Sequence, residues 1–291
     1  MNARLTGTAA VVAYGITGLT CIFIALPLAV LVAMSFSDTD YIVFPPQGFT
    51  LRWYVQVLQD PEFLHPLAYS TMLAAGATIG SLALGTPAAF AVARYRFPGR
   101  DVLRALLLSP LIVPAIVTGI AMLRLFTAAR STDAGIQLLL AHTVITLPYV
   151  VRTVTASLEL ADTSIEEAAR TLGAGRWRTF RRITVPQIAP GLAAGALFSF
   201  IISFDNYPIS MWLSDAQHLP LPITLYNFIA RMFDPSLAAI STLMIVLAAV
   251  LVIVLERMMG LRRPWESDRA RAAPAQHRYE PTQTGGVKTW P

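Results

Sequence analysis

The polar segment best suited to recognition chemistry begins at a pair of acids, Glu166 and Glu167. Thr163 or Ser164 can cap a helix at this point, and acidic groups in the first turn are favoured by the helix dipole. The segment carries no nucleophile signature of the Gly-x-Ser-x-Gly type. It therefore predicts a short helix with an acidic start, suited to binding and not to catalysis.

A glycine corner and a second helix are predicted directly afterwards. Gly173 or Gly175 can end the first helix, in which Ala168 and Ala169 permit close approach. Two aromatic and four basic residues follow: Trp177 and Phe180, with Arg176, Arg178, Arg181 and Arg182. Two short helices at a corner form a compact knob that suits docking into a groove of another protein. The same residues equally suit a helix lying on a membrane surface, so the residues alone leave both interpretations open.

A single carboxylate, Asp205, lies within an otherwise apolar stretch. An acid inside a membrane helix is costly unless it faces protein or water, so it marks a solute path or a polar lock. In a path it would attract a cation, with hydrogen bonds or cation-π contacts from Phe204, Asn206 and Tyr207. The alternative interpretation is a capping residue where Pro208 breaks the helix.

Prolines within the apolar stretches can also shape a cavity. Pro110, Pro114 and Pro148 can kink the helices that contain them, or can simply be tolerated there. Tyr149, beside Pro148, is a further candidate for the solute path.

The chain carries no signature of nucleotide or metal chemistry. A phosphate-cradling loop places Gly immediately before Lys, whereas the only lysine, Lys288, follows Val287 in a tail rich in Pro, Gln and Gly. The four histidines are scattered and lack the i, i+4 pair or the cysteine partners of a zinc site. We therefore expect no cofactor, no metal and no enzyme activity in this chain, and ATP bound only by separate subunits.

The elements that must position these residues are membrane helices. The 291 residues are 55% hydrophobic and 13% charged, whereas about a quarter of the residues are charged in a soluble domain. Apolar blocks long enough to cross a bilayer occur at about 10–34, 69–93, 105–123, 134–151, 188–212 and 236–255. Because these runs lack the alternation of a membrane barrel, we expect an all-α fold with six transmembrane helices. Asp205 then lies in the fifth span, toward its external end.

The basic residues predict the orientation. Eighteen of the 22 lysines and arginines fall at the two termini and in every second loop, and only four fall on the other side. The side that keeps the basic residues is the cytoplasm, so both termini are expected there. This asymmetry accounts for the pI of about 9.7, and we expect no nucleic-acid partner.

The segment after Ser164 resembles the EAA loop of ABC importer permeases. In that family the loop reads Glu-Ala-Ala, three residues, Gly, nine residues, Ile-x-Leu-Pro. The matching positions are Glu167, Ala168, Ala169, Gly173, Ile183 and Pro186, with Val185 in place of Leu. In the family this loop inserts into a cleft of the ATPase subunit and passes its motion to the spans. The resemblance thus implies a coupling role for these residues and for the preceding Glu166.

The resemblance extends from the first to the sixth predicted span and is closest to the polyamine-type permeases. Phe49 to Tyr54 is similar to an external amphipathic segment of that subfamily, and 204–207 and 219–226 are similar to its region after the EAA loop. This implies the type I ABC importer architecture and transport of polyamines or a related small cationic solute. Permeases for opines, thiamine or ferric iron are alternatives. An alternative from another class is a membrane-embedded docking or regulatory subunit that moves no solute.

The resemblance also implies partners and a location. We expect a multi-pass protein of the bacterial cytoplasmic membrane, in contact with lipid, that works with two ATPase subunits and a periplasmic solute-binding protein. A second homologous permease is expected, as a heterodimer in preference to a homodimer. The permease domain is expected over 1–261, with the coupling loop at about 152–187. Residues 262–291 lack apolar periodicity, so a disordered cytoplasmic tail is expected.

Overall fold

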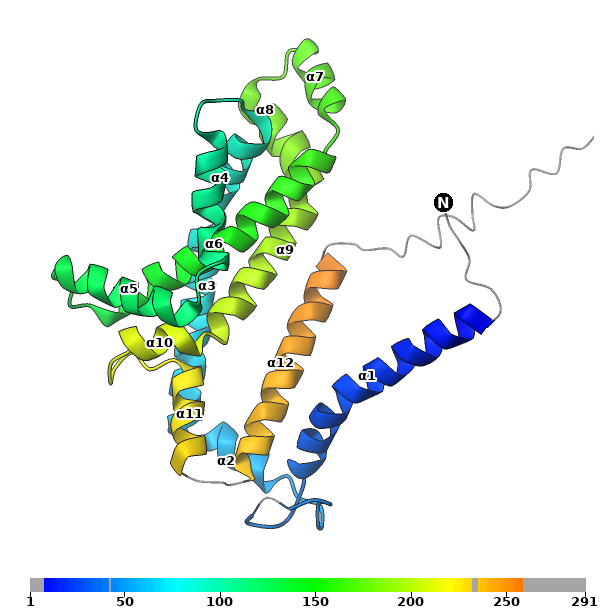
Figure 1. The fold of residues 1–291 in the computed structure, drawn as a ribbon, viewed down its shortest axis with the longest axis vertical. Helices are drawn as coiled ribbons and strands as arrows, with labels where there is room; N and C mark the ends of the chain where they lie inside the picture. The colour runs from blue at the N-terminus through cyan, green and yellow to red at the C-terminus, as the bar shows by residue number, and fades with distance from the viewer. Residues whose placement is uncertain (1–7, 42, 232–234, 259–291) are drawn as a thin grey trace, which may run out of the picture. The chain divides into compact units, whose positions relative to one another are not determined.

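A computed structural model describes residues 8–41, 43–231 and 235–258 of the chain. The compact unit to which they belong ends at Met259, and the tail expected over 262–291 lies outside the described residues. Within those ranges every regular element is helical, which confirms the all-α prediction (Figure 1). The elements are α1 (Thr8–Met34), α2 (Arg52–Gln59), α3 (Pro61–Arg94), α4 (Arg100–Leu108), η1 (Ser109–Leu111), α5 (Ala115–Ala128), α6 (Ala134–Leu160), α7 (Thr163–Thr171), α8 (Arg176–Thr179), η2 (Phe180–Thr184), α9 (Val185–Phe204), α10 (Tyr207–Leu213), α11 (Leu221–Arg231) and α12 (Ser236–Met258).

Four of the described helices are long and apolar enough to cross a membrane. They are α1, α3, α6 and the continuous helix formed by α8, η2 and α9. A fifth span results if α4, η1 and α5 are counted as one bent unit. The sixth predicted block coincides with α12, whose apolar part is shorter within the described side chains, Ser236–Val250. Each predicted block thus falls on helical segments, the third and the fifth on more than one helix, and the count of six spans stays a prediction.

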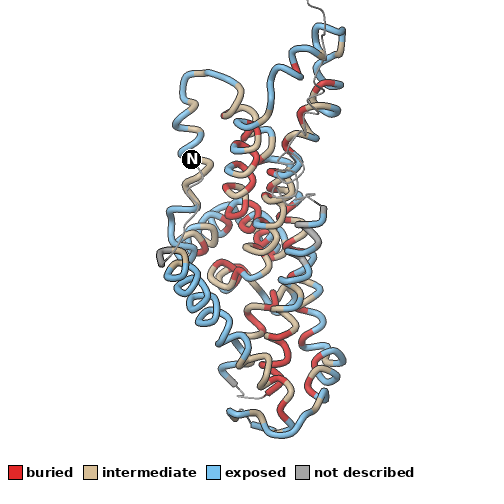
Figure 2. The backbone as a smooth tube through the Cα atoms, turned by 90° about the vertical axis from the view of Figure 1, so that its right-hand side faces the viewer, coloured by how far each residue is buried: buried red, intermediate tan, exposed pale blue. Residues whose placement is uncertain are grey.

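The helices α3, α6 and α9 pack against one another and form the centre of the described unit. Many of the buried residues lie on these three helices (Figure 2). Thr146 of α6 joins all three, because its hydroxyl pairs with Ser81 Oγ of α3 at 2.6 Å and its carbonyl accepts the Ser199 hydroxyl of α9 at 3.3 Å. These three buried hydroxyls are therefore satisfied between helices, where lipid offers no other partner.

The contact of α9 with α6 runs along a stripe of small residues. Four buried residues spaced four apart make the stripe: Gly191, Gly195, Ser199 and Ser203. A Cβ on Gly195 would lie 2.7 Å from Thr153 Oγ1 and 3.1 Å from Val150 Cα. Lipid provides no hydrophobic force between apolar helices, so van der Waals contact at such close approach is what holds them together.

The third predicted span is broken at its prolines. The axis of the α4–η1 segment meets that of α5 at 106°. Pro110 lies in η1 and Pro114 directly precedes α5, and proline ends helices because it lacks an N–H and fixes φ. Pro148, in contrast, lies within the uninterrupted α6. The kink expected at Pro110 and Pro114 is present.

The prediction of a single fifth span over 188–212 is wrong. The helix α9 ends at Phe204, and α10 begins at Tyr207. The physical reason is a new helix start, since the Asn206 side chain accepts the backbone N–H of Ile209 at 3.1 Å and Pro208 occupies the first turn of α10. Asp205 consequently lies at a helix end and not inside a span.

The amphipathic segment predicted before the second span is α2, and it anchors the end of α1. Trp53 Nε1 donates to the carbonyl of Ser37 at 2.9 Å, and the hydroxyls of Tyr54 and Ser35 lie 2.5 Å apart. Most side chains in the rest of α1 are exposed. An apolar helix with this exposure is surrounded by lipid or by another chain.

Replacing Gly195 with leucine should push α9 away from α6, because atoms of Val150 and Thr153 fill the space that the new side chain needs. Overpacking of this kind costs about 1–3 kcal/mol. The matched control is Gly18→Leu in α1, where an added Cβ meets no atom within 4 Å. Thermal unfolding in nanodiscs measures the difference, and equal melting temperatures for the two variants would contradict the close contact.

Candidate functional site

Both ends of α7 are set by local backbone contacts. Asp162 caps the helix by accepting the N–H of Ser164 at 2.9 Å, which corrects the expectation that Thr163 or Ser164 is the cap. Hydrogen bonds from the side chain and backbone of Ser164 hold the pKa of the Asp162 carboxyl below its usual value. At the other end Gly173 has a φ of +85°, a left-handed conformation that glycine adopts without strain. The corner expected here is present.

Glu166 faces the body of the protein. Its Oε1 lies 3.3 Å from Nη2 of Arg94, the last residue of α3, and accepts the hydroxyl of Thr184 in η2 at 3.0 Å. Only 7% of Glu166 is exposed. This position differs from the exposed one expected of a docking residue, because the end of α3 supplies a cation at this turn of α7. Glu166 ties α7 to α3 and to the helix that leads into α9.

The residues that α7 and α8 expose lie elsewhere around the corner. Glu167 and Ala168 are exposed, and Ala169 is half-buried. Leu172 is 88% exposed and Trp177 is 71% exposed. We call Glu167, Ala168, Leu172 and Trp177 the corner surface. Large apolar side chains that project to this extent beside an acid are typical of an interaction surface.

The second helix of the corner continues into the membrane. The elements α8, η2 and α9 form one helix with a π-helical turn at η2, so the predicted second short helix is the start of a long one. Trp177 stacks on Phe180 with ring centroids 5.7 Å apart, and Phe180 packs edge-on against Phe90 of α3 at 5.8 Å. Ile183 is half-buried, and Pro186 is exposed in the first turn of α9.

Asp205 follows α9 directly, and its side chain is exposed. It lines a cavity of about 270 Å³ between α9, α11 and α12. The other residues that line this cavity, among them Phe200, Leu225 and Met244, carry no charge. The hydrogen bonds and ion pairs recorded within the described ranges include none to the Asp205 carboxylate. The capping role considered for Asp205 is carried out by Asn206.

The neighbours of Asp205 contribute to the helix break. Asn206 is 9% exposed, and its side-chain oxygen is occupied by the cap of α10. The ring of Tyr207 lies 5.0 Å from that of Tyr226 in α11. The ring of Phe204 stacks on that of Phe200, one turn earlier in α9. The Asp205 carboxylate thus has no recorded partner in the described part of the chain, whereas the Asn206 side-chain oxygen is used by the helix cap.

The remaining candidate for the solute path lies apart from this group. The ring of Tyr149 is 6.3 Å from that of Phe198, which precedes Asp205 by roughly 10 Å along the axis of α9. The contacts recorded for the described residues do not join Tyr149 to Asp205.

A histidine that the sequence argument set aside holds the helix break from inside. His142 of α6 is fully buried. Its Nδ1 lies 2.8 Å from Ser203 Oγ in α9, and its Nε2 lies 3.2 Å from Ser210 Oγ in α10. One ring thus joins the two helices on either side of the break. The sequence feature that could have indicated this role is a histidine within an apolar span, because a polar side chain there needs hydrogen-bond partners.

The model of one protein family matches residues 81–265, and the family is described as the binding-protein-dependent transport system inner membrane component. The match covers more than half of the chain. The chain belongs to this family. It is therefore a permease component of an ABC importer and not an enzyme, and membership implies an ATPase and a solute-binding protein as partners.

Three relatives from Escherichia coli K12 show how far the similarity extends. The spermidine/putrescine permease PotC is 32% identical over 79% of this chain and 87% of its own length. The putrescine permease PotI is 32% identical over 77% of this chain and 82% of its own. The sulfate permease CysT is 30% identical over 80% of this chain and 85% of its own length.

A solved structure has the same fold. In a bacterial ABC transporter involved in the import of the acidic polysaccharide alginate, one chain matches with a TM-score of 0.67 and 19% identity, over 88% of this chain and 99% of that one. At this identity the likeness supports the architecture alone, and it confirms the predicted fold class of an ABC importer permease.

Replacing Arg94 with glutamine should loosen α7, because Glu166 would keep a nearly buried carboxylate without its cation. We expect a local loss of about 2 kcal/mol and faster tryptic cleavage at Arg170 and Arg176, measured by mass spectrometry in nanodiscs. The control is Arg96→Gln, which changes an exposed arginine near the same helix end. Cleavage rates that do not separate the two variants would rule out the bracing role of the ion pair.

Proposed function

We propose that this permease imports polyamines or a related small cationic solute and couples to its ATPase through the corner surface. The observation that carries the coupling proposal is the construction of α7, which presents Glu167 outward and holds Glu166 in a buried ion pair. The match of Glu167, Ala168, Ala169, Gly173, Ile183 and Pro186 to the EAA pattern supports it.

The corner surface has the construction that transfer of force requires. Glu167, Ala168 and Leu172 project from α7, while the buried Glu166 of the same helix is bound to the end of α3 and to η2. A load applied to the exposed residues would pass directly into two spans. The alternative of a membrane-surface helix would place the same apolar residues in lipid, and family membership, which implies an ATPase partner, favours docking.

The proposed complex contains two permeases and two ATPase subunits. This chain has one EAA-type segment, so a second permease must supply the other, and a heterodimer is preferred because polyamine-type systems usually use two different permeases. A solute-binding protein delivers the solute on the external face. Solute moves because ATP and the binding protein stabilise the inward and outward states to different extents.

A cationic solute is supported by Asp205 and by the relatives that are named for spermidine and putrescine. A carboxylate on an apolar cavity, with no recorded partner in the described ranges, favours a positive group. The sulfate permease is almost as similar overall, so the charge of the solute has to be tested on the acidic residues themselves. Opines, thiamine and ferric iron are the alternatives.

The proposed topology places both termini in the cytoplasm, on the distribution of basic residues. The corner surface and the Arg94 end of α3 are then cytoplasmic, and the Pro61 end of α3 faces outward. Residues 262–291 are proposed to be a cytoplasmic extension outside the permease domain.

Glu167→Lys should uncouple transport from ATP hydrolysis, because it reverses the charge on the corner surface and leaves the buried Glu166 pair intact. We expect stimulation of the ATPase by loaded binding protein to fall at least about tenfold, equivalent to about 1.4 kcal/mol, with the complex still assembled. Asp101→Lys makes the same charge change at an exposed site on α4 and is the control. Normal stimulation and uptake in the Glu167 variant would refute the coupling role.

Asp205→Asn should reduce import of putrescine about fivefold, the size expected when one exposed ion pair is lost. Asparagine keeps the shape of the side chain and removes the charge. The control is Asp101→Asn, which removes the charge of an exposed acid in the first turn of α4. Kinetics in proteoliposomes with the binding protein present decide the point, and unchanged import by the Asp205 variant would remove this residue from the path.

A further inference from the structure

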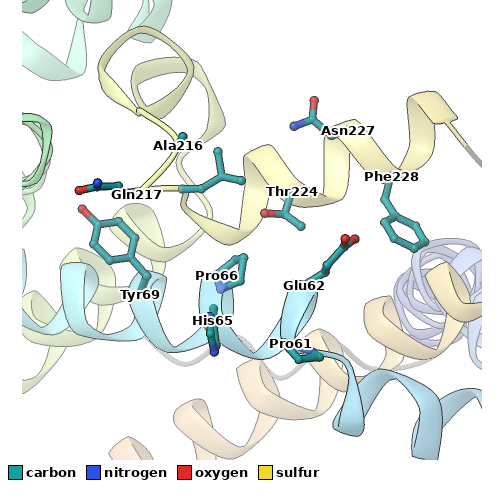
Figure 3. A pocket seen from close by; sticks show the side chains of 11 residues that line it. Pro61, Glu62, His65, Pro66, Tyr69, Ala216, Gln217, Thr224, Asn227 and Phe228 are labelled. Carbon is teal, nitrogen blue, oxygen red and sulfur yellow. The ribbon is translucent and has the colours of Figure 1, made fainter.

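A polar pocket opens at the end of α3 opposite to the corner surface. It lies between the first turns of α3, the segment 214–220 and α11, and has a volume of about 520 Å³. It shares no lining residue with the cavity of Asp205. Figure 3 shows the Glu62 side chain projecting from α3 toward Thr224 and Phe228 of α11. In the proposed topology this pocket faces the external solution.

Glu62 brings a negative charge to the pocket from the first turn of α3. The cap of α3 is supplied by Asp60, which accepts the N–H of Glu62 at 2.9 Å. The ion pairs recorded for the described residues do not include the Glu62 carboxylate, and the described lining contains no lysine or arginine. The ring of Phe228 stands beside it, and Tyr69 lines the pocket about two turns further along α3 (Figure 3). A free carboxylate beside an aromatic ring favours a cation.

Thr224 gives an independent indication of a ligand. Its side chain is 8% exposed, and its Oγ1 has no hydrogen-bond partner among the described atoms. A buried hydroxyl that lacks a partner is costly, and its lone pairs can accept an N–H from a bound group. Thr224 lies on the side of α11 that faces Glu62 (Figure 3).

We propose that this pocket binds a primary ammonium group of the solute at the external entrance of the permease. Glu62 is the counter-charge, Thr224 accepts an N–H, and Phe228 offers an aromatic face. The inference rests on the proposed function in assigning the ammonium group to the transported solute. α11 lines both cavities, through Thr224 here and through Leu225 beside Asp205, so two carboxylates flank different faces of one helix.

The test uses the complete complex of both permeases and the ATPase in nanodiscs. A Cys21→Ser chain, which lacks the only cysteine, receives Asn227→Cys, because Asn227 is exposed and lines the pocket. An ammonium-bearing methanethiosulfonate should label this thiol faster than a neutral one, and the ratio of the two labelling rates is the quantity measured. Glu62→Gln should lower this labelling ratio about threefold, as for loss of one exposed ion pair. Putrescine should slow labelling by the ammonium reagent. Asp101→Asn removes a first-turn acid from α4 and should leave the ratio unchanged.

Thr224→Val adds a readout that a structural role would not move. It removes the hydroxyl at similar shape, so protection by putrescine should weaken about threefold, consistent with loss of one hydrogen bond, while the melting temperature holds. Putrescine uptake at limiting loaded binding protein should fall with Glu62→Gln and not with Asp101→Asn.

The outcomes separate this inference from the proposed function. If Glu62→Gln leaves the labelling ratio unchanged in a complex that still imports putrescine, the proposed ammonium site is overturned and the importer function stays in place. A complex that imports no polyamine would overturn the proposed function and with it the assignment to solute. If Glu62→Gln instead lowers ATPase stimulation by unliganded binding protein and putrescine gives no protection, the pocket receives a basic side chain of that protein, and the solute assignment is overturned.

Discussion

Close approach of α6 to α3 and α9 is the constraint on which the rest of the described structure depends. Apolar helices in lipid gain nothing from hiding their surface from one another, so they associate through small residues and through hydrogen bonds between helices. Gly195 lets α9 reach the backbone of α6, and Thr146 is hydrogen-bonded from both neighbouring helices. Larger residues along this line would separate the helices, and the polar contacts at either end of the group would lose their geometry.

At each end of the group formed by α3, α6 and α9, one buried polar side chain joins two other elements. At the corner, one buried carboxylate, Glu166, binds groups on α3 and η2. Near the break, one buried imidazole, His142, binds hydroxyls on α9 and α10. In each case a side chain in a low-dielectric setting meets two partners from other elements, which makes its position costly to change. Under the proposed coupling, a displacement of α7 therefore moves whole helices and not a loop.

Short sequence patterns predicted the features that depend only on residues near one another in the chain. The apolar blocks located the helices, and Gly173 predicted the corner because a left-handed residue is needed to end α7. A break at Pro208 was one of two interpretations of the stretch around Asp205. The span was nevertheless expected to run to 212 because hydropathy continues through Ile209 to Leu213, and an asparagine cap is a weak signal within an apolar run. The burial of Glu166 depends on Arg94, 72 residues earlier, and no periodicity reports such a pairing. The unpartnered Thr224 is likewise a tertiary property, visible only after α11 is placed beside α3.

The helix α3 relates the proposed solute pocket to the proposed coupling site. Glu62 lies in its first turn and Arg94 is its last residue, so one helix of roughly 50 Å carries both groups. A helix is stiff along its axis, but Pro66 and Pro87 lie inside this one, and each removes a backbone hydrogen bond near one end. The stretch between them packs on α6, whereas the two ends meet α11 and α7. Bending is therefore least costly at the prolines, next to the two proposed sites. Under the proposed function, the central stretch would keep its small-residue contacts while the ends responded to solute and to the ATPase.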